Sequence, residues 1–220
     1  MELFFQYLLA FSVGLISGLL VSIPVGPINI TIINEGASRG FRWAVMISFG
    51  SVVMELIYCI IGFAGFSELF DSRWVRACME LIGFLLMLFI GLKYLLLHEI
   101  PTATKTEEDV ERRFHPHTAF MTGFVRTLGN PGVLLGWIAI SAAFIAHEWV
   151  KPTWDSKLMC IIGVCVGASA WFLFMSYVAS LGKNRLSKKT LLRLSQMSGG
   201  LLLIMAAIIA SRIIRLLAHR

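Results

Sequence analysis

The chain has 220 residues, of which 57% are hydrophobic and 15% are charged, and its formal net charge is +6. Soluble domains carry roughly 25% charged residues, and a chain this short cannot hide so much apolar surface in one core. The composition therefore excludes a water-soluble globule and predicts an all-α integral membrane protein in the lipid bilayer. The basic residues are scattered between apolar stretches without interleaved aromatics, which argues against a nucleic-acid partner.

Six apolar stretches are long enough for the ~20 residues that a crossing helix needs. These predicted transmembrane helices cover residues 4–24, 43–66, 75–97, 119–146, 158–181 and 197–217. An even number of crossings puts the N-terminus and the C-terminus on the same side of the membrane. If that side is the periplasm, the cytoplasmic loops carry more Lys and Arg than the outer ones, so we expect periplasmic termini.

A polar stretch at 98–118 divides the chain into two halves, 1–97 and 119–220, with three predicted spans each. Because three is odd, a second half built like the first crosses the membrane in the opposite direction. Such inverted repeats are typical of many secondary transporters. We therefore predict a 3+3 inverted repeat of six helices, joined by a polar connecting loop.

The first and fourth predicted helices each contain a helix-breaking sequence. These are Pro24-Val25-Gly26-Pro27 and Gly129-Asn130-Pro131-Gly132. Proline removes an amide donor and clashes with the preceding turn, so both helices should unwind there. A new helix can begin at Pro27 and at Pro131, with Asn130 as a cap. The free amides at 28–30 and 132–134 would then form a site for a carboxylate; two kinks without a ligand are the alternative.

Two charged residues fall inside predicted spans. Glu55 lies near the middle of the second, where a carboxylate costs roughly 2.5 to 3.5 kcal/mol on insertion scales. It could bind an ammonium group, take up a proton, or hold helices together by hydrogen bonds. Arg126 lies about one helical turn before Asn130 and shares its face. It could contact an anionic group, pair with Glu55, or extend toward the membrane surface.

Small residues recur along two predicted spans, at Gly14, Gly18, Ser22 and Gly26 in the first and at Gly163 and Gly167 in the fifth. Such stripes let helix backbones approach closely in lipid. They favour packing within the chain, and a homodimer is the alternative. His115 and His117 lack a third ligand at helical spacing, and no enzyme or cofactor motif is present, so we expect no metal site, no cofactor and no enzyme.

The stretch SIPVGPINITIINEGASRGFRWAVMISFGSVVMELIY resembles the N-terminal signature of the lysine and homoserine exporter family, of LysE/RhtB type. Arg39-Gly40 matches the family's polar turn, Gly50 matches its glycine, and Glu55 stands where the family typically has Asp. The stretch AFMTGFVRTLGNPGVLLGWIAISAAF is similar to the family's second signature. Gly132 departs from the Lys that often follows Asn-Pro there.

The resemblance implies a multi-pass transporter of the bacterial inner membrane, driven by protons, that exports an amino acid or a related small carboxylate-bearing metabolite. Gly132 makes a neutral substrate at least as suitable as a dibasic one. The residues expected around the substrate are Pro24, Gly26, Pro27, Asn29, Glu55, Arg126, Asn130 and Pro131. A divalent-cation exporter of related architecture is the alternative, although it would need more than one intramembrane acid.

Overall fold

The computed structural model describes residues 2–64, 73–99, 105–181 and 187–218. All regular elements in these ranges are helices. They are α1 (Glu2–Ser22), α2 (Pro27–Arg39), α3 (Phe41–Ala64), α4 (Arg73–Leu95), α5 (Lys105–Phe114), α6 (Ala119–Leu128), α7 (Pro131–Ala146), α8 (Trp154–Ser180) and α9 (Lys188–Ala218). The expectation of an all-α membrane protein is confirmed.

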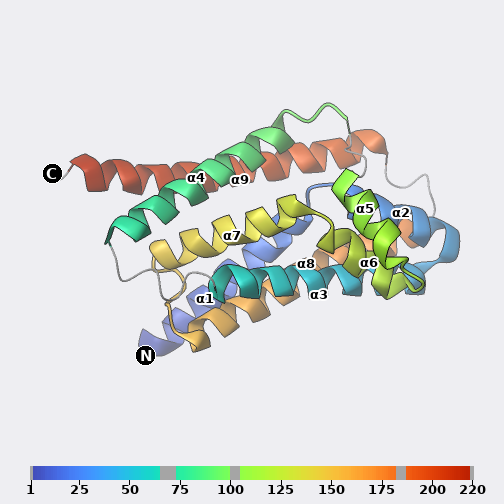
Figure 1. The fold of residues 1–220 in the computed structure, drawn as a ribbon, viewed down its shortest axis with the longest axis horizontal. Coiled ribbons are helices and arrows are strands. Elements are labelled where there is room, and N and C mark those ends of the chain that lie inside the picture. The colour runs from blue at the N-terminus through green and yellow to red at the C-terminus, as the bar shows by residue number, and fades with distance from the viewer. Residues whose placement is uncertain (1, 65–72, 100–104, 182–186, 219–220) are drawn as a thin grey trace.

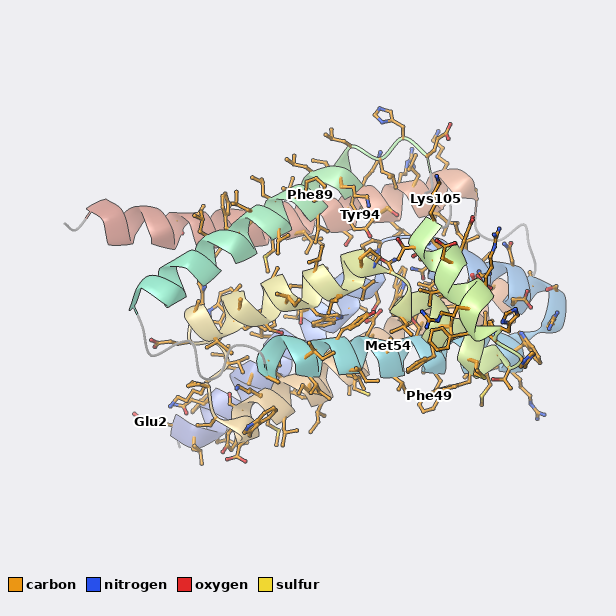
Figure 2. The ribbon with its side chains drawn as sticks, in the orientation of Figure 1. Glu2, Phe49, Met54, Phe89, Tyr94 and Lys105 are labelled. Atoms are coloured by element: carbon orange, nitrogen blue, oxygen red, sulfur yellow. The ribbon has the colours of Figure 1, made fainter. Side chains whose placement is uncertain are left out.

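The long helices run roughly along one axis of the molecule, and the short helices α2, α5 and α6 gather at one end (Figure 1). The beginning of α1 and the end of α9 both lie toward the opposite end. Large apolar side chains cover the outer surface: Phe49 of α3 and Phe89 of α4 are 56% and 67% exposed (Figure 2). An outer surface of this kind suits contact with lipid and not with water.

Four helices are long and apolar enough to cross a membrane: α1, α3, α8 and the 189–208 part of α9. A fifth crossing results if α6 and α7, which are bent by 67° at their junction, form one broken span. The predicted third span corresponds to α4, whose described apolar part, Phe84–Leu95, is shorter than the others. The described residues thus give four to five candidate spans where the sequence predicted six.

The two glycine stripes face each other. A Cβ on Gly14 would lie 2.1 Å from the carbonyl oxygen of Cys160, and one on Gly167 would lie 2.1 Å from that of Leu15. Helices α1 and α8 therefore touch backbone to backbone, which only glycine permits. The stripes thus pack against each other within one chain, as expected from the sequence.

Helices α3 and α6 make a second contact of the same kind. A Cβ on Gly50 would lie 2.0 Å from the carbonyl oxygen of Phe120, and one on Gly123 would lie 1.8 Å from that of Ile47. Glycine at 50 and at 123 thus fixes how closely the second and fourth predicted spans approach.

The polar segment 98–118, expected as a connecting loop, contains the helix α5. This helix packs on the junction between α6 and α7, where a Cβ on Gly129 would lie 2.9 Å from the Cα of Glu107. Helix α5 therefore covers the second of the two predicted breaks.

Candidate functional site

The first helix break lies where the sequence predicted it. Helix α1 ends at Ser22 and α2 begins at Pro27. The Asn29 amide nitrogen donates to the carbonyl oxygens of Ser22 at 3.1 Å and Pro24 at 3.0 Å, and its oxygen accepts from the Trp171 indole at 3.2 Å. The buried Asn29 side chain thus ties the unwound backbone to α8. Unwound backbone at membrane depth requires such partners.

The start of α2 has no side-chain cap. Gly26 takes the N-cap position with φ −110° and ψ −170°, and Pro27 opens the helix. The amide of Ile30 donates to the Gly26 carbonyl oxygen at 3.1 Å. The amides of Ile28 and Asn29 occupy the two positions that a capping side chain ordinarily serves. Among the described residues, no side chain caps these two backbone donors at the start of α2.

The second break is capped. Pro131 opens α7, and the Asn130 side-chain oxygen accepts from the amides of Gly132 at 3.0 Å and Val133 at 3.3 Å. Asn130 therefore caps α7, as the sequence predicted. Its side chain occupies two of the amides that we expected to be free for a carboxylate, so the two breaks differ in the donors that they leave open.

Glu55 lies in the middle of α3 and is 3% exposed. The Ser22 hydroxyl donates to a carboxylate oxygen of Glu55 at 3.3 Å. This contact joins the carboxylate to the last residue before the first break. The pairing with Arg126, one of the alternatives that the sequence left open, does not occur, because Arg126 binds Glu111.

Neighbouring polar residues of α3 reach the second break. The hydroxyls of Ser51 and Thr127 lie 2.7 Å apart, and the Tyr58 hydroxyl donates to the carbonyl oxygen of Leu128 at 2.7 Å. Ser51, Glu55 and Tyr58 follow each other at intervals of four and three residues, so they share one face of α3. That face connects Glu55 with both breaks.

A small cavity of about 50 Å³ lies where the two breaks approach each other. Val21 and Pro24 line it from the first break, and Gly132 and Val133 line it from the second. The other lining residues come from α4, α7 and α9 and are mostly apolar. Glu55 is not one of the described residues that line this cavity. Its volume has room for a few water molecules and not for an amino acid.

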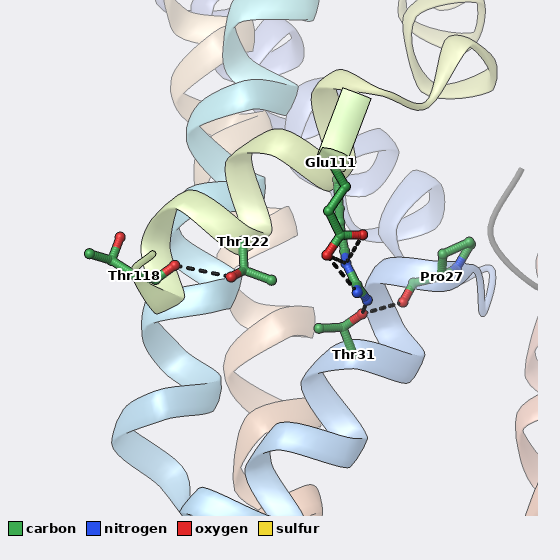
Figure 3. A network of polar contacts seen from close by, with 6 residues as sticks. Pro27, Thr31, Glu111, Thr118 and Thr122 are labelled. Carbon is green, nitrogen blue, oxygen red and sulfur yellow. Dashed lines mark hydrogen bonds and ion pairs between the residues drawn. The ribbon is translucent and has the colours of Figure 1, made fainter. Parts of the chain in front are cut away.

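Arg126 lies in a different pocket, on the side of α6 that faces α5 and α2. Its guanidinium donates to both carboxylate oxygens of Glu111 in α5, with N–O distances from 2.9 to 3.2 Å, and a third nitrogen donates to the Thr31 hydroxyl in α2. In Figure 3, Glu111 and Thr31 approach this point from two sides. Of the three roles considered for Arg126, the structure shows contact with an anionic group, and that group belongs to the chain itself.

Several polar partners were missed in the sequence, namely Ser22, Ser51, Tyr58, Glu111 and Trp171. The polar residues of α3 carried a usable signal, because they recur at helical spacing in an otherwise apolar stretch. Glu111 carried none, because it is one of several charges in a polar segment. No group of three or more metal-ligating side chains occurs in the described part of the chain.

Two curated proteins are similar to the chain along most of its length. One, named "Putative amino acid efflux protein YcgF", from Bacillus subtilis (strain 168), is 26% identical over 93% of both chains. The other, named "Chemotactic transduction protein ChpE", from Pseudomonas aeruginosa, is 23% identical over 73% of this chain and 77% of its own. No solved structure matches the chain.

The family comparison covers the site as well as the bundle. The model of the LysE type translocator family matches residues 19–212, a range that includes both breaks, Glu55 and Arg126. Members of this family are transporters and not enzymes, which fits a multi-pass protein of the inner membrane. The chain belongs to the LysE type translocator family.

Proposed function

We propose that the protein exports an amino acid, or a related small carboxylate-bearing metabolite, in exchange for protons. The observation that carries this proposal is the position of Glu55. It is a buried carboxylate that contacts the first break through Ser22 and shares a helix face with two residues that contact the second. An intramembrane acid so placed marks a transport site by default. The relative named for amino acid efflux supports the same substrate class.

The proposed substrate lies between the two breaks while it is carried. An amino acid has one negative and one positive group, and each needs an opposite charge or dipole when it is buried. The amides of Ile28 and Asn29, presented by Gly26 and Pro27, hold the carboxylate. Glu55 holds the ammonium group or the exchanged proton. Pro24, Asn130 and Pro131 shape the unwound segments around the substrate.

We propose that the present conformation is a closed state, and the small volume between the breaks supports this. About 50 Å³ cannot hold an amino acid, so the two halves must move apart to admit one. We propose that α1 with α8, and α3 with α6, move as two rigid pairs, because each pair is in backbone contact. Alternating access by rigid-body motion of one helix bundle against another is typical of secondary transporters.

The same contacts support the inverted repeat as a proposal. If the second half repeats the first, the first span corresponds to the fourth and the second span corresponds to the fifth. A contact between the first and fifth spans then has its counterpart in a contact between the fourth and second. Both pairs are the ones in glycine-mediated contact, at Gly14 with Cys160 and at Gly50 with Phe120. The third and sixth spans, α4 and α9, also touch, where a Cβ on Gly91 would lie 3.1 Å from the Gly199 carbonyl oxygen. We place both termini in the periplasm, as the basic loop residues favour.

Metabolite analysis of the growth medium tests the proposed function. Bacterial cells with and without the expressed protein are compared, with the Glu55→Gln variant as a matched control for the membrane load. We expect at least one amino acid or amino-acid-like acid to accumulate outside only in cells with the unaltered protein. The cultures are grown under conditions that raise the internal concentration of every amino acid. Equal amino-acid concentrations in the media of all three cultures would then contradict the export of amino acids or related acids.

A further inference from the structure

The polar pocket around Arg126 has the size and charges of a second ligand site. Its volume is about 380 Å³, several times that of the cavity between the breaks. It is lined by Arg126, Arg39, Glu35, Glu111, Asn34 and Thr31, among others. Both ion pairs within it, Arg126 with Glu111 and Arg39 with Glu35, are partly exposed. The pocket therefore offers acidic and basic groups that water and solutes can reach.

The geometry at Arg126 is that of carboxylate recognition. The guanidinium holds the Glu111 carboxylate through two of its nitrogens, the planar arrangement that arginine forms with carboxylates. The side chains of Arg126 and Glu111 are each 30% exposed. A carboxylate that comes from solution can thus compete with Glu111 for the same donors.

Arg126 is also connected to both helix breaks. It lies on α6 one turn before Asn130, and it donates to Thr31, whose own hydroxyl donates to the Pro27 carbonyl oxygen at 2.8 Å (Figure 3). Glu111 belongs to α5, the helix that packs over Gly129 in the second break. Exchange of Glu111 for another carboxylate would release α5 from Arg126.

We propose that this pocket is a loading site for a zwitterionic amino acid, in which Glu111 occupies the place of the substrate carboxylate until the substrate displaces it. The substrate carboxylate binds Arg126, and its ammonium group faces the acidic side chain of Glu35. Displacement frees α5, which uncovers the second break and lets the substrate move toward Glu55. This inference rests on the proposed export function for its substrate class, and it assigns a separate site.

Binding to the purified full-length protein tests the loading site. The twenty standard amino acids are screened one by one by thermal shift, and the strongest stabiliser is titrated against the unaltered protein, Glu111→Gln and Glu108→Gln. Glu108 lies in α5 and is exposed, so its variant makes the same charge change away from the pocket. We expect Glu111→Gln to bind at least about fivefold more tightly, a size typical of coupling between two sites, and Glu108→Gln to bind as the unaltered protein does.

Three further arms separate a ligand site from a structural ion pair. The methyl ester of the same amino acid and acetate alone should each bind much more weakly than the free amino acid. Arg126→Lys keeps the charge, loses the two-point contact, and should weaken binding. A lower melting temperature of Glu111→Gln without tighter binding would show that the ion pair is structural and overturn the proposal. Absence of stabilisation by any of the twenty amino acids would overturn it as well.

The Glu55→Gln background distinguishes this proposal from the export site. The pocket contains neither Glu55 nor its partner Ser22, so binding and the Glu111→Gln effect should persist in that background. If they persist while transport does not depend on Glu55, the site between the breaks is wrong and the loading site stands. If export of an amino acid is found but Glu111→Gln leaves its affinity unchanged, the loading site alone is wrong.

Discussion

The Ser22 hydroxyl donates to the Glu55 carboxylate at 3.3 Å, so the last residue of α1 and the middle of α3 share one buried polar contact. Ser22 also holds the break itself, because its carbonyl oxygen accepts from the Asn29 side chain at 3.1 Å. Ser22 therefore connects Glu55 with the end of the first unwound segment.

Glu55→Gln should abolish transport and leave the fold intact. The amide keeps the shape and can still accept the Ser22 hydrogen bond, but it can neither carry a proton nor bind an ammonium ion. Glu55→Asp keeps the charge and should retain part of the activity. The variants are compared by insertion, by the sharpness of the size-exclusion peak and by transport rate. A Gln variant as active as the Asp variant would refute a role that depends on charge.

Gly26→Ser should weaken substrate binding without loss of stability. The backbone of Gly26 is extended, and a Cβ there would meet nothing within 4 Å. A serine hydroxyl at the N-cap accepts from the second or third amide of the helix, which here are Ile28 and Asn29. Since these amides are the proposed carboxylate donors, the cap would compete with the substrate. If the variant is at least as heat-stable as the original and its transport kinetics are unchanged, the amides of Ile28 and Asn29 are not the donors to the substrate carboxylate.

Asn130→Ala should destabilise the protein by about 1 kcal/mol, the usual value of a helix cap. The substitution removes the oxygen that accepts from the amides of Gly132 and Val133. Asn130→Asp keeps an acceptor there and serves as the control. Thermal unfolding in detergent measures the difference; equal melting temperatures for the Ala and Asp variants would mean that water replaces the cap.

Neighbouring glycines in α9 should respond in opposite directions to alanine. A Cβ on Gly199 would lie 2.5 Å from the Leu95 amide nitrogen, whereas one on Gly200 would meet nothing within 4 Å. Gly199→Ala should therefore cost roughly 1 to 3 kcal/mol through overpacking. Gly200→Ala should stabilise by up to about 1 kcal/mol through helix propensity. Melting temperatures of the two variants test the packing of α9 on α4, and a reversed order would contradict it.

The sequence predicted the helix breaks well because their causes are local. Pro27 and Pro131 cannot continue a helix from the preceding turn and suit the first position of a new one, so the restarts follow from the residues alone. The close packing of α1 on α8 was also predictable, because small residues such as Gly14 and Gly163 recur on one face of each helix and let helix backbones approach closely.

The arrangement around the charges could not be predicted, because it depends on contacts between distant segments. Asn130 was predictable as a cap because it directly precedes Pro131, but nothing in the sequence showed that Asn29 holds the unwound backbone. From the sequence alone, Arg126 could pair with Glu55 as well as with any other acid. Glu111 is its partner because α5 packs beside α6 in the folded chain. The predicted third span at 75–97 coincides closely with α4, Arg73–Leu95, because helix boundaries follow from the local sequence.

Transport by the purified protein in lipid vesicles directly tests whether Glu55 couples amino-acid export to proton movement. Vesicles are loaded with an equimolar mixture of the standard amino acids, a proton gradient is imposed, and the external solution is analysed with time for the unaltered protein, Glu55→Asp and Glu55→Gln. We predict that at least one amino acid leaves faster with the unaltered protein than from vesicles without protein, that protons move in the opposite direction, and that Glu55→Gln removes both fluxes. Release at the same rate from Glu55→Gln vesicles, or from vesicles without protein, would contradict it.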